Sequence, residues 1–115
     1  MMRVRMRFRH FIAPLIAAAA CVATSAGAAD LAAGMAKANE VCASCHGLDG
    51  NSTSQDFPKL GGQYPDYLAK SLRDYKSGDR KNAIMASFAK PLSTQDIDNL
   101  AAYYAAQPAV VSSKH

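Results

Sequence analysis

The hydrophobic residues that follow Asp30 recur at intervals of three and four, which is the spacing of one face of an α-helix. The first run comprises Leu31, Met35, Ala38 and Val41. Asp30 stands directly before it and can cap a helix, because its carboxylate accepts hydrogen bonds from the first free backbone N–H groups. The pattern therefore predicts a helix that begins after Asp30.

Three more segments show helical signals. Pro65 suits the first turn of a helix that ends at Gly78, and its apolar face carries Leu68, Leu72 and Tyr75. A short helical piece is expected over residues 83–90, where Pro91 interrupts it. Ser93 then reads as the N-cap of a last helix, which ends before Pro108 and carries Ile97, Leu100, Ala101 and Tyr104 at helical spacing together with Asp96 in its first turn.

The segment between the first two predicted helices, residues 47–62, has no periodicity and is rich in Gly, Ser, Asn and Pro. A structureless loop of this length is unusual in a compact domain and needs something to hold it in place. Strand signals are nearly absent. The sequence predicts an all-α domain of three to four short helices around a ligand, over residues 30–108, with a polar tail over residues 109–115.

Charge separates the N-terminal segment from this domain. The formal net charge is +4, but four of the thirteen basic residues are Arg3, Arg5, Arg7 and Arg9. From Asp30 onward, nine basic residues balance nine acidic ones. A nucleic-acid-binding domain should carry its positive charge on the folded body, so no nucleic-acid partner is expected.

The basic start continues into an apolar stretch from Phe11 to Ala23 and then into small residues. This order is typical of a secretory signal peptide, here over residues 1–29 with cleavage near Ala28/Ala29. The apolar stretch is too short for a comfortable membrane span, so no stable membrane insertion is expected after cleavage, although an uncleaved anchor is the alternative. The mature protein is expected in the periplasm.

Cleavage would remove Cys21 and leave Cys42 and Cys45, which cannot tie distant parts of a chain together. With His46 they form C-x-x-C-H, the attachment signature of c-type haem. Residues three and four apart share one face of a helix, so two thiols can reach the two vinyl groups along one porphyrin edge while the imidazole reaches the iron. The motif predicts one covalently attached haem c, with Cys42 and Cys45 as thioether residues and His46 as proximal iron ligand.

Two other sites use similar residues. A thiol–disulfide C-x-x-C motif expects a thioredoxin-like βαβ setting, which this sequence lacks. A structural zinc site needs four ligands, and beyond the motif the mature chain offers only His115. Haem is therefore the favoured ligand.

The candidates for the second axial ligand of the iron can be reduced by elimination. The mature chain has two methionines, and Met35 lies seven residues before Cys42, on the helix expected to carry the cysteines. Met85 lies far downstream, where the chain can have reached the opposite face of the haem. We expect Met85 as the distal ligand. His115 is the rival, at a chain end where order is uncommon.

These motifs resemble small bacterial class I cytochromes c, near the cytochrome c4, c5 and c553 types. The matching segments are Cys42-Ala-Ser-Cys45-His46-Gly47, Pro58-Lys-Leu60-Gly-Gly62-Gln63, Tyr67-Leu68, Gly78-x-Arg80, Met85, and Leu92-Ser93 with Leu100-Ala-Ala-Tyr103-Tyr104. The resemblance implies the class I cytochrome c fold, Met85 as distal ligand and one-electron transfer. It also implies that Gly34 lets Tyr103 of the last helix pack closely, that the Pro58 carbonyl accepts a hydrogen bond from His46, and that Leu60 lines the haem pocket.

We therefore expect a soluble periplasmic electron carrier, not an enzyme, that is a monomer or weak dimer and exchanges electrons with membrane or periplasmic redox proteins. Two alternatives stay open: a dedicated electron-transfer subunit of a periplasmic dehydrogenase, and a haem-based sensor whose sixth iron position is open. Surface lysines spread among the acidic residues favour solubility over a strongly charged docking face.

Overall fold

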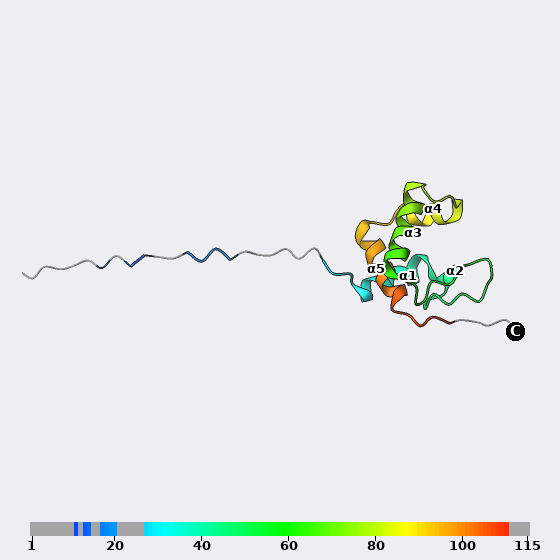
Figure 1. Cartoon of the computed structure of the whole chain (residues 1–115), viewed down its shortest axis with the longest axis horizontal. Helices are drawn as coiled ribbons and strands as arrows, with labels where there is room; N and C mark the ends of the chain where they lie inside the picture. The colour runs from blue at the N-terminus through cyan, green and yellow to red at the C-terminus, as the bar shows by residue number, and fades with distance from the viewer. Residues whose placement is uncertain (1–10, 12, 15–16, 21–26, 111–115) are drawn as a thin grey trace, which may run out of the picture.

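The computed structural model describes residues 11, 13–14, 17–20 and 27–110. Within these ranges the chain forms helices and no strand, which confirms the predicted all-α class. The helices are α1 (Leu31–Val41), α2 (Ala43–His46), α3 (Pro65–Ser77), α4 (Ala83–Ala89) and α5 (Thr94–Ala105), as Figure 1 shows. Most of the predicted signal peptide, Cys21 included, lies outside the described residues, as does His115. In the described part of the chain, no helix has the length and hydrophobicity needed to cross a membrane.

The ends of the helices follow the capping signals of the sequence. The Asp30 carboxylate accepts a hydrogen bond of 3.0 Å from the Ala33 N–H at the start of α1. At the start of α5, the Ser93 hydroxyl accepts from the Asp96 N–H, and the Asp96 carboxylate accepts from the Ser93 N–H, both at 3.0 Å. Gly78 ends α3 with φ of 88°, a conformation that favours glycine.

The terminal helices α1 and α5 cross where Gly34 faces α5. Gly34 is buried, and a Cβ atom built on it would lie 2.8 Å from both the Asn99 carbonyl carbon and the Tyr103 Cβ. The backbone N–H of Asp30 also donates to the Asn99 side chain at 2.8 Å. The helices therefore approach through backbone at Gly34, which brings Tyr103 against α1 as the resemblance implied.

Only part of the apolar pattern of the first helix is buried. Ala38 is buried against α5 together with Gly34, whereas the side chains of Leu31 and Met35 are 51% and 49% exposed. One sequence prediction about this helix is wrong, because the cysteines do not continue α1. Cys42 has φ of −114° between the two helices, so Cys45 and His46 lie on the separate single turn α2.

The long loop between α2 and α3 occupies one end of the molecule, and α4 lies beside α3 at the other end (Figure 1). The segment after α5 runs along this loop. The Asn51 side chain donates to the Pro108 carbonyl at 2.8 Å and accepts from the Val110 N–H at 3.0 Å, and Lys59 donates to the Val110 carbonyl at 2.9 Å. The first residues of the predicted tail are thus in contact with the domain.

Candidate haem site

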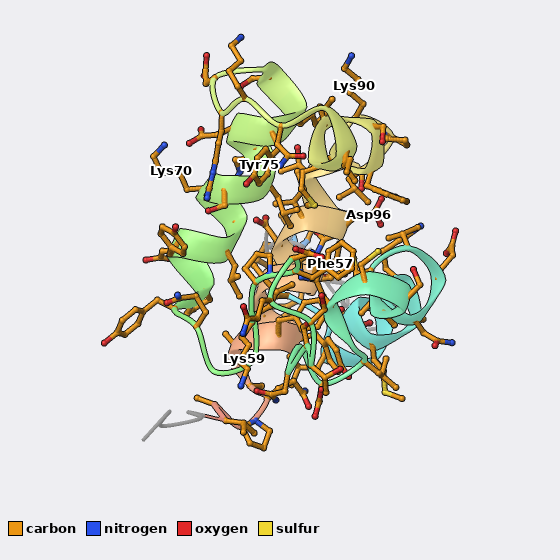
Figure 2. The ribbon with its side chains drawn as sticks, turned by 90° about the vertical axis from the view of Figure 1, so that its right-hand side faces the viewer. Phe57, Lys59, Lys70, Tyr75, Lys90 and Asp96 are labelled. Carbon is orange, nitrogen blue, oxygen red and sulfur yellow. The ribbon has the colours of Figure 1, made fainter. Side chains whose placement is uncertain are left out.

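A cavity of about 310 Å³ lies between the α2–α3 loop and the helices α3, α4 and α5. Figure 2 shows Phe57 on the loop and Tyr75 on α3, two of the residues that line it, whereas Lys70 and Lys90 point away from the body of the protein. Much of the wall is apolar, with Val41, Leu60, Leu68, Leu72, Ile84, Phe88, Leu100 and Ala101. Its volume is within the range of cavities that bind cofactors.

Both thiols of the C-x-x-C-H motif line this cavity and are half-buried. Burial raises the pKa of the Cys42 thiol to about 11, although a hydrogen bond with the Tyr104 side chain acts in the opposite direction. Cys42 is therefore a neutral thiol near pH 7 in the chain without haem. Residues 42 and 45 are close along the chain but not bonded to each other, which leaves both sulfur atoms available for thioether bonds.

His46 is the buried member of the motif, with 7% of its surface exposed. Its Nδ1 donates a hydrogen bond of 2.8 Å to the Pro58 carbonyl, the contact that the resemblance implied. The Phe57 ring meets the imidazole edge-on, with 6.3 Å between the ring centroids. Because Nδ1 is occupied by a carbonyl, Nε2 is the nitrogen that can bind a metal.

Met85 lines the same cavity from the first turn of α4 and is half-buried. The Asn82 side chain caps this helix by accepting a hydrogen bond of 2.9 Å from the Met85 N–H. This cap fixes the backbone from which the thioether side chain projects. The structure therefore gathers all six candidate residues, Cys42, Cys45, His46, Pro58, Leu60 and Met85, around one cavity.

Two further groups belong to the site: Tyr104, which the sequence did not assign to it, and Arg80, which the sequence named only as one of several candidates for contact with the haem edge or its propionates. Tyr104 lines the cavity from α5, where the helical pattern indicated only a core position. Arg80 also lines the cavity; its guanidinium lies 4.8 Å from the centre of the Tyr75 ring and donates to the Ser71 hydroxyl at 3.2 Å. The segment Gly78-x-Arg80 carried a signal for this position, whereas the inward direction of Tyr104 depends on the α1–α5 crossing.

The chemistry of the lining fits haem. The lining contains two thiols, an imidazole whose Nδ1 is bonded to the Pro58 carbonyl so that Nε2 remains for a metal, and a thioether from α4. Apolar residues from α3, α4 and α5 provide a surface for the porphyrin, and Arg80 provides a positive charge at the cavity. The fold and the site together define a helical domain built to hold a covalently attached haem.

Residues 31–106 match the family model described as Cytochrome c. This match covers more than half of the chain, so the protein belongs to the cytochrome c family and its cofactor is covalently bound haem c, with Cys42 and Cys45 in a fitting C-x-x-C-H arrangement. Family membership also confirms the expected class I fold.

Three comparisons place the chain within the family. It is 52% identical over 79 residues to cytochrome c4 of Thiocapsa roseopersicina, covering 69% of this chain and 41% of that protein. It is 42% identical over 83 residues to cytochrome c-554(548) of Halomonas halodenitrificans, covering 70% of this chain and 99% of that protein. The crystal structure of reduced recombinant cytochrome c4 from Pseudomonas stutzeri superposes with a TM-score of 0.68 at 43% identity, covering 73% of this chain and 48% of the other. The chain thus spans less than half the length of both of these cytochrome c4 proteins.

Proposed function

We propose that this protein carries single electrons, with a haem iron held between His46 and Met85. The observation that carries the proposal is the hydrogen bond from His46 Nδ1 to the Pro58 carbonyl, which leaves Nε2 for the iron in a cavity that Met85 also lines. The haem supplies the redox change between Fe(II) and Fe(III). The proposal requires no side chain to act as an acid, base or nucleophile. This agrees with the carrier role of the cytochrome c4 relatives.

The surrounding residues would set how readily the iron is oxidised. A His/Met ligand pair favours a high reduction potential. The apolar lining acts in the same direction, since a dry environment disfavours the additional positive charge of Fe(III). Pro58 would hold the imidazole in one orientation in both oxidation states, which keeps the change in geometry on electron transfer small.

Redox partners would approach the mouth of the cavity. Tyr67, Ile84 and Phe88 line the cavity and yet are 51%, 62% and 44% exposed. Because nine basic residues balance nine acidic ones from Asp30 onward, long-range steering is weak and an apolar rim of this kind would make the contact. We propose a short-lived complex at this rim, formed by a monomer or weak dimer. Chromatography and light scattering of the haem-loaded protein measure its oligomeric state.

Export to the periplasm with removal of residues 1–29 is the second part of the proposal. It is supported by the basic, apolar and small-residue order of the N-terminal segment. An intact mass equal to residues 29–115 or 30–115 plus one haem would support cleavage and covalent attachment together. A mass that retains the N-terminal segment would contradict the cleavage.

Met85→Ala tests the axial ligand, with Met35→Ala as the matched control, because Met35 lies on the exposed face of α1. We expect Met85→Ala to abolish the far-red charge-transfer band of methionine-ligated ferric haem and to lower the reduction potential. Met35→Ala should leave both unchanged. Persistence of the band in Met85→Ala would exclude Met85 and point to Met35, the other methionine of the mature chain. Absence of the band in wild type would instead point to a ligand other than methionine, such as His115.

The same spectra separate the two alternatives. A wild-type protein that lacks the band and binds carbon monoxide rapidly has an open sixth position, which is the property of a sensor. A dedicated dehydrogenase subunit would show the band but would be recovered from its host in a stable complex with that enzyme.

A further inference from the structure

Two neighbouring tyrosines of α5 bind the segment that directly follows His46. The Tyr104 hydroxyl donates to the Gly47 carbonyl at 3.2 Å, and the Tyr103 hydroxyl donates to the Leu48 carbonyl at 2.7 Å. Both tyrosines are buried, with 3% and 7% of their surface exposed. Two consecutive carbonyls after the histidine are therefore bound by two consecutive side chains from a helix more than fifty residues away along the chain.

The arrangement is more specific than packing requires. Consecutive residues on an α-helix project about 100° apart, and the two rings are inclined at 62° with their centroids 5.2 Å apart. Tyr103 passes α1 at Gly34, whereas the Tyr104 ring packs against the backbone of Gly50, where a Cβ would lie 2.8 Å from the ring. Phenylalanine would fill the same space at either position. The role of the two hydroxyl groups is therefore to form the hydrogen bonds with the Gly47 and Leu48 carbonyls.

The short helix α2 cannot hold His46 on its own. It has four residues, and a single turn is unstable without tertiary support because nucleation fixes several dihedral angles for one hydrogen bond. Its last carbonyls also lack partners within the helix. Gly47 leaves α2 with φ of 83°, so the chain turns sharply directly after the histidine. The imidazole is held through Nδ1 by Pro58, but the main chain that carries it needs a separate support.

We propose that Tyr103 and Tyr104 are positioning residues for the proximal histidine: their hydroxyls fix the main chain at Gly47 and Leu48, and Pro58 fixes the ring. The inference rests on the proposed role of His46 as iron ligand. With both supports present, the imidazole can neither tilt nor slide relative to α5. The Tyr104 side chain also interacts with the Cys42 thiol, so one residue contacts the first residue of the C-x-x-C-H motif and the glycine that directly follows the motif.

The test uses the haem-loaded protein with Tyr103→Phe, Tyr104→Phe and the double variant. Tyr64→Phe is the matched control, since Tyr64 is 79% exposed and lies outside the cavity lining. Amide exchange at residues 46–48, the paramagnetically shifted ring protons of His46 and the reduction potential are measured for each. Each buried hydroxyl removed should raise the amide exchange rate about tenfold, the equivalent of one hydrogen bond.

In the supporting result, the His46 ring shifts and the potential change in both single variants, change further in the double variant and stay constant in Tyr64→Phe. A fall in melting temperature with unchanged His46 shifts and potential would overturn the proposal and leave the tyrosines with a structural role alone. Failure of the proposed function is recognised separately, because wild-type protein would then lack the spectrum of a His/Met haem whatever the tyrosine variants show.

Discussion

Replacement of Gly34 by alanine tests the crossing of α1 and α5 most directly. The added methyl group would lie 2.8 Å from the Asn99 carbonyl carbon and from Tyr103 Cβ, and closer still to the Asn99 carbonyl oxygen, whereas ordinary contact begins at 3.4 Å. The Asn99 carbonyl oxygen would lie 2.2 Å from the new methyl group, so the helices must separate by about 1.2 Å to restore ordinary contact, and the obstacle is backbone that cannot rotate away. Overpacking of this kind costs about 3 kcal/mol, and alanine returns about 1 kcal/mol through its higher helix propensity.

The expected net loss of about 2 kcal/mol corresponds to a melting temperature lower by about 8–16 °C in a domain of this size. Thermal and guanidinium unfolding of the haem-loaded protein, followed by far-UV circular dichroism, measure it. Ala36→Gly on the exposed face of α1 is the control and should lose about 1 kcal/mol from helix propensity alone. If Gly34→Ala matches or exceeds the wild type in stability, the close approach of the two helices is refuted.

Two further predictions concern the ends of α5. Ser93→Ala removes the capping box and should cost about 1 kcal/mol of unfolding free energy, measured by guanidinium titration; an unchanged midpoint would contradict the cap. The backbone hydrogen bond from Ser93 lowers the pKa of Asp96, so its contribution is present above the pKa of the unfolded chain and is lost as the pH falls below about 4. Asn51→Ala removes both bonds to the segment after α5 and should cost about 1–2 kcal/mol and speed proteolysis at residues 108–110. Asn39→Ala on the exposed side of α1 should do neither.

The sequence was sufficient for the helices and for the identity of the ligand, because both depend on local patterns. The helix ends are set by interactions with the backbone within a few residues, at Asp30, Pro65, Gly78 and Ser93. The C-x-x-C-H motif is equally local. These features need no knowledge of which helices meet.

What the sequence could not supply depends on the tertiary arrangement. The spacing of Leu31 and Met35 predicts an apolar face, but Gly34 allows a closer approach on another side of the helix and therefore decides which side is buried. The break between α1 and α2 at Cys42 is not marked in the sequence by a proline or a glycine. The Tyr104 side chain points into the cavity, and Asn51 forms a hydrogen bond with Pro108. Both features depend on contacts between residues more than fifty positions apart, which a periodic sequence pattern cannot predict.

The long sequence separation of these contacts has a consequence for the order of folding. The groups that hold the haem-binding loop, from Tyr103 to Val110, are synthesised after the motif, and their bonds close loops of 55–59 residues. Native contacts between residues so far apart form more slowly than the local hydrogen bonds of a helix. The two thiols therefore remain accessible in the chain until the last helix docks, which gives covalent attachment an interval before the site closes.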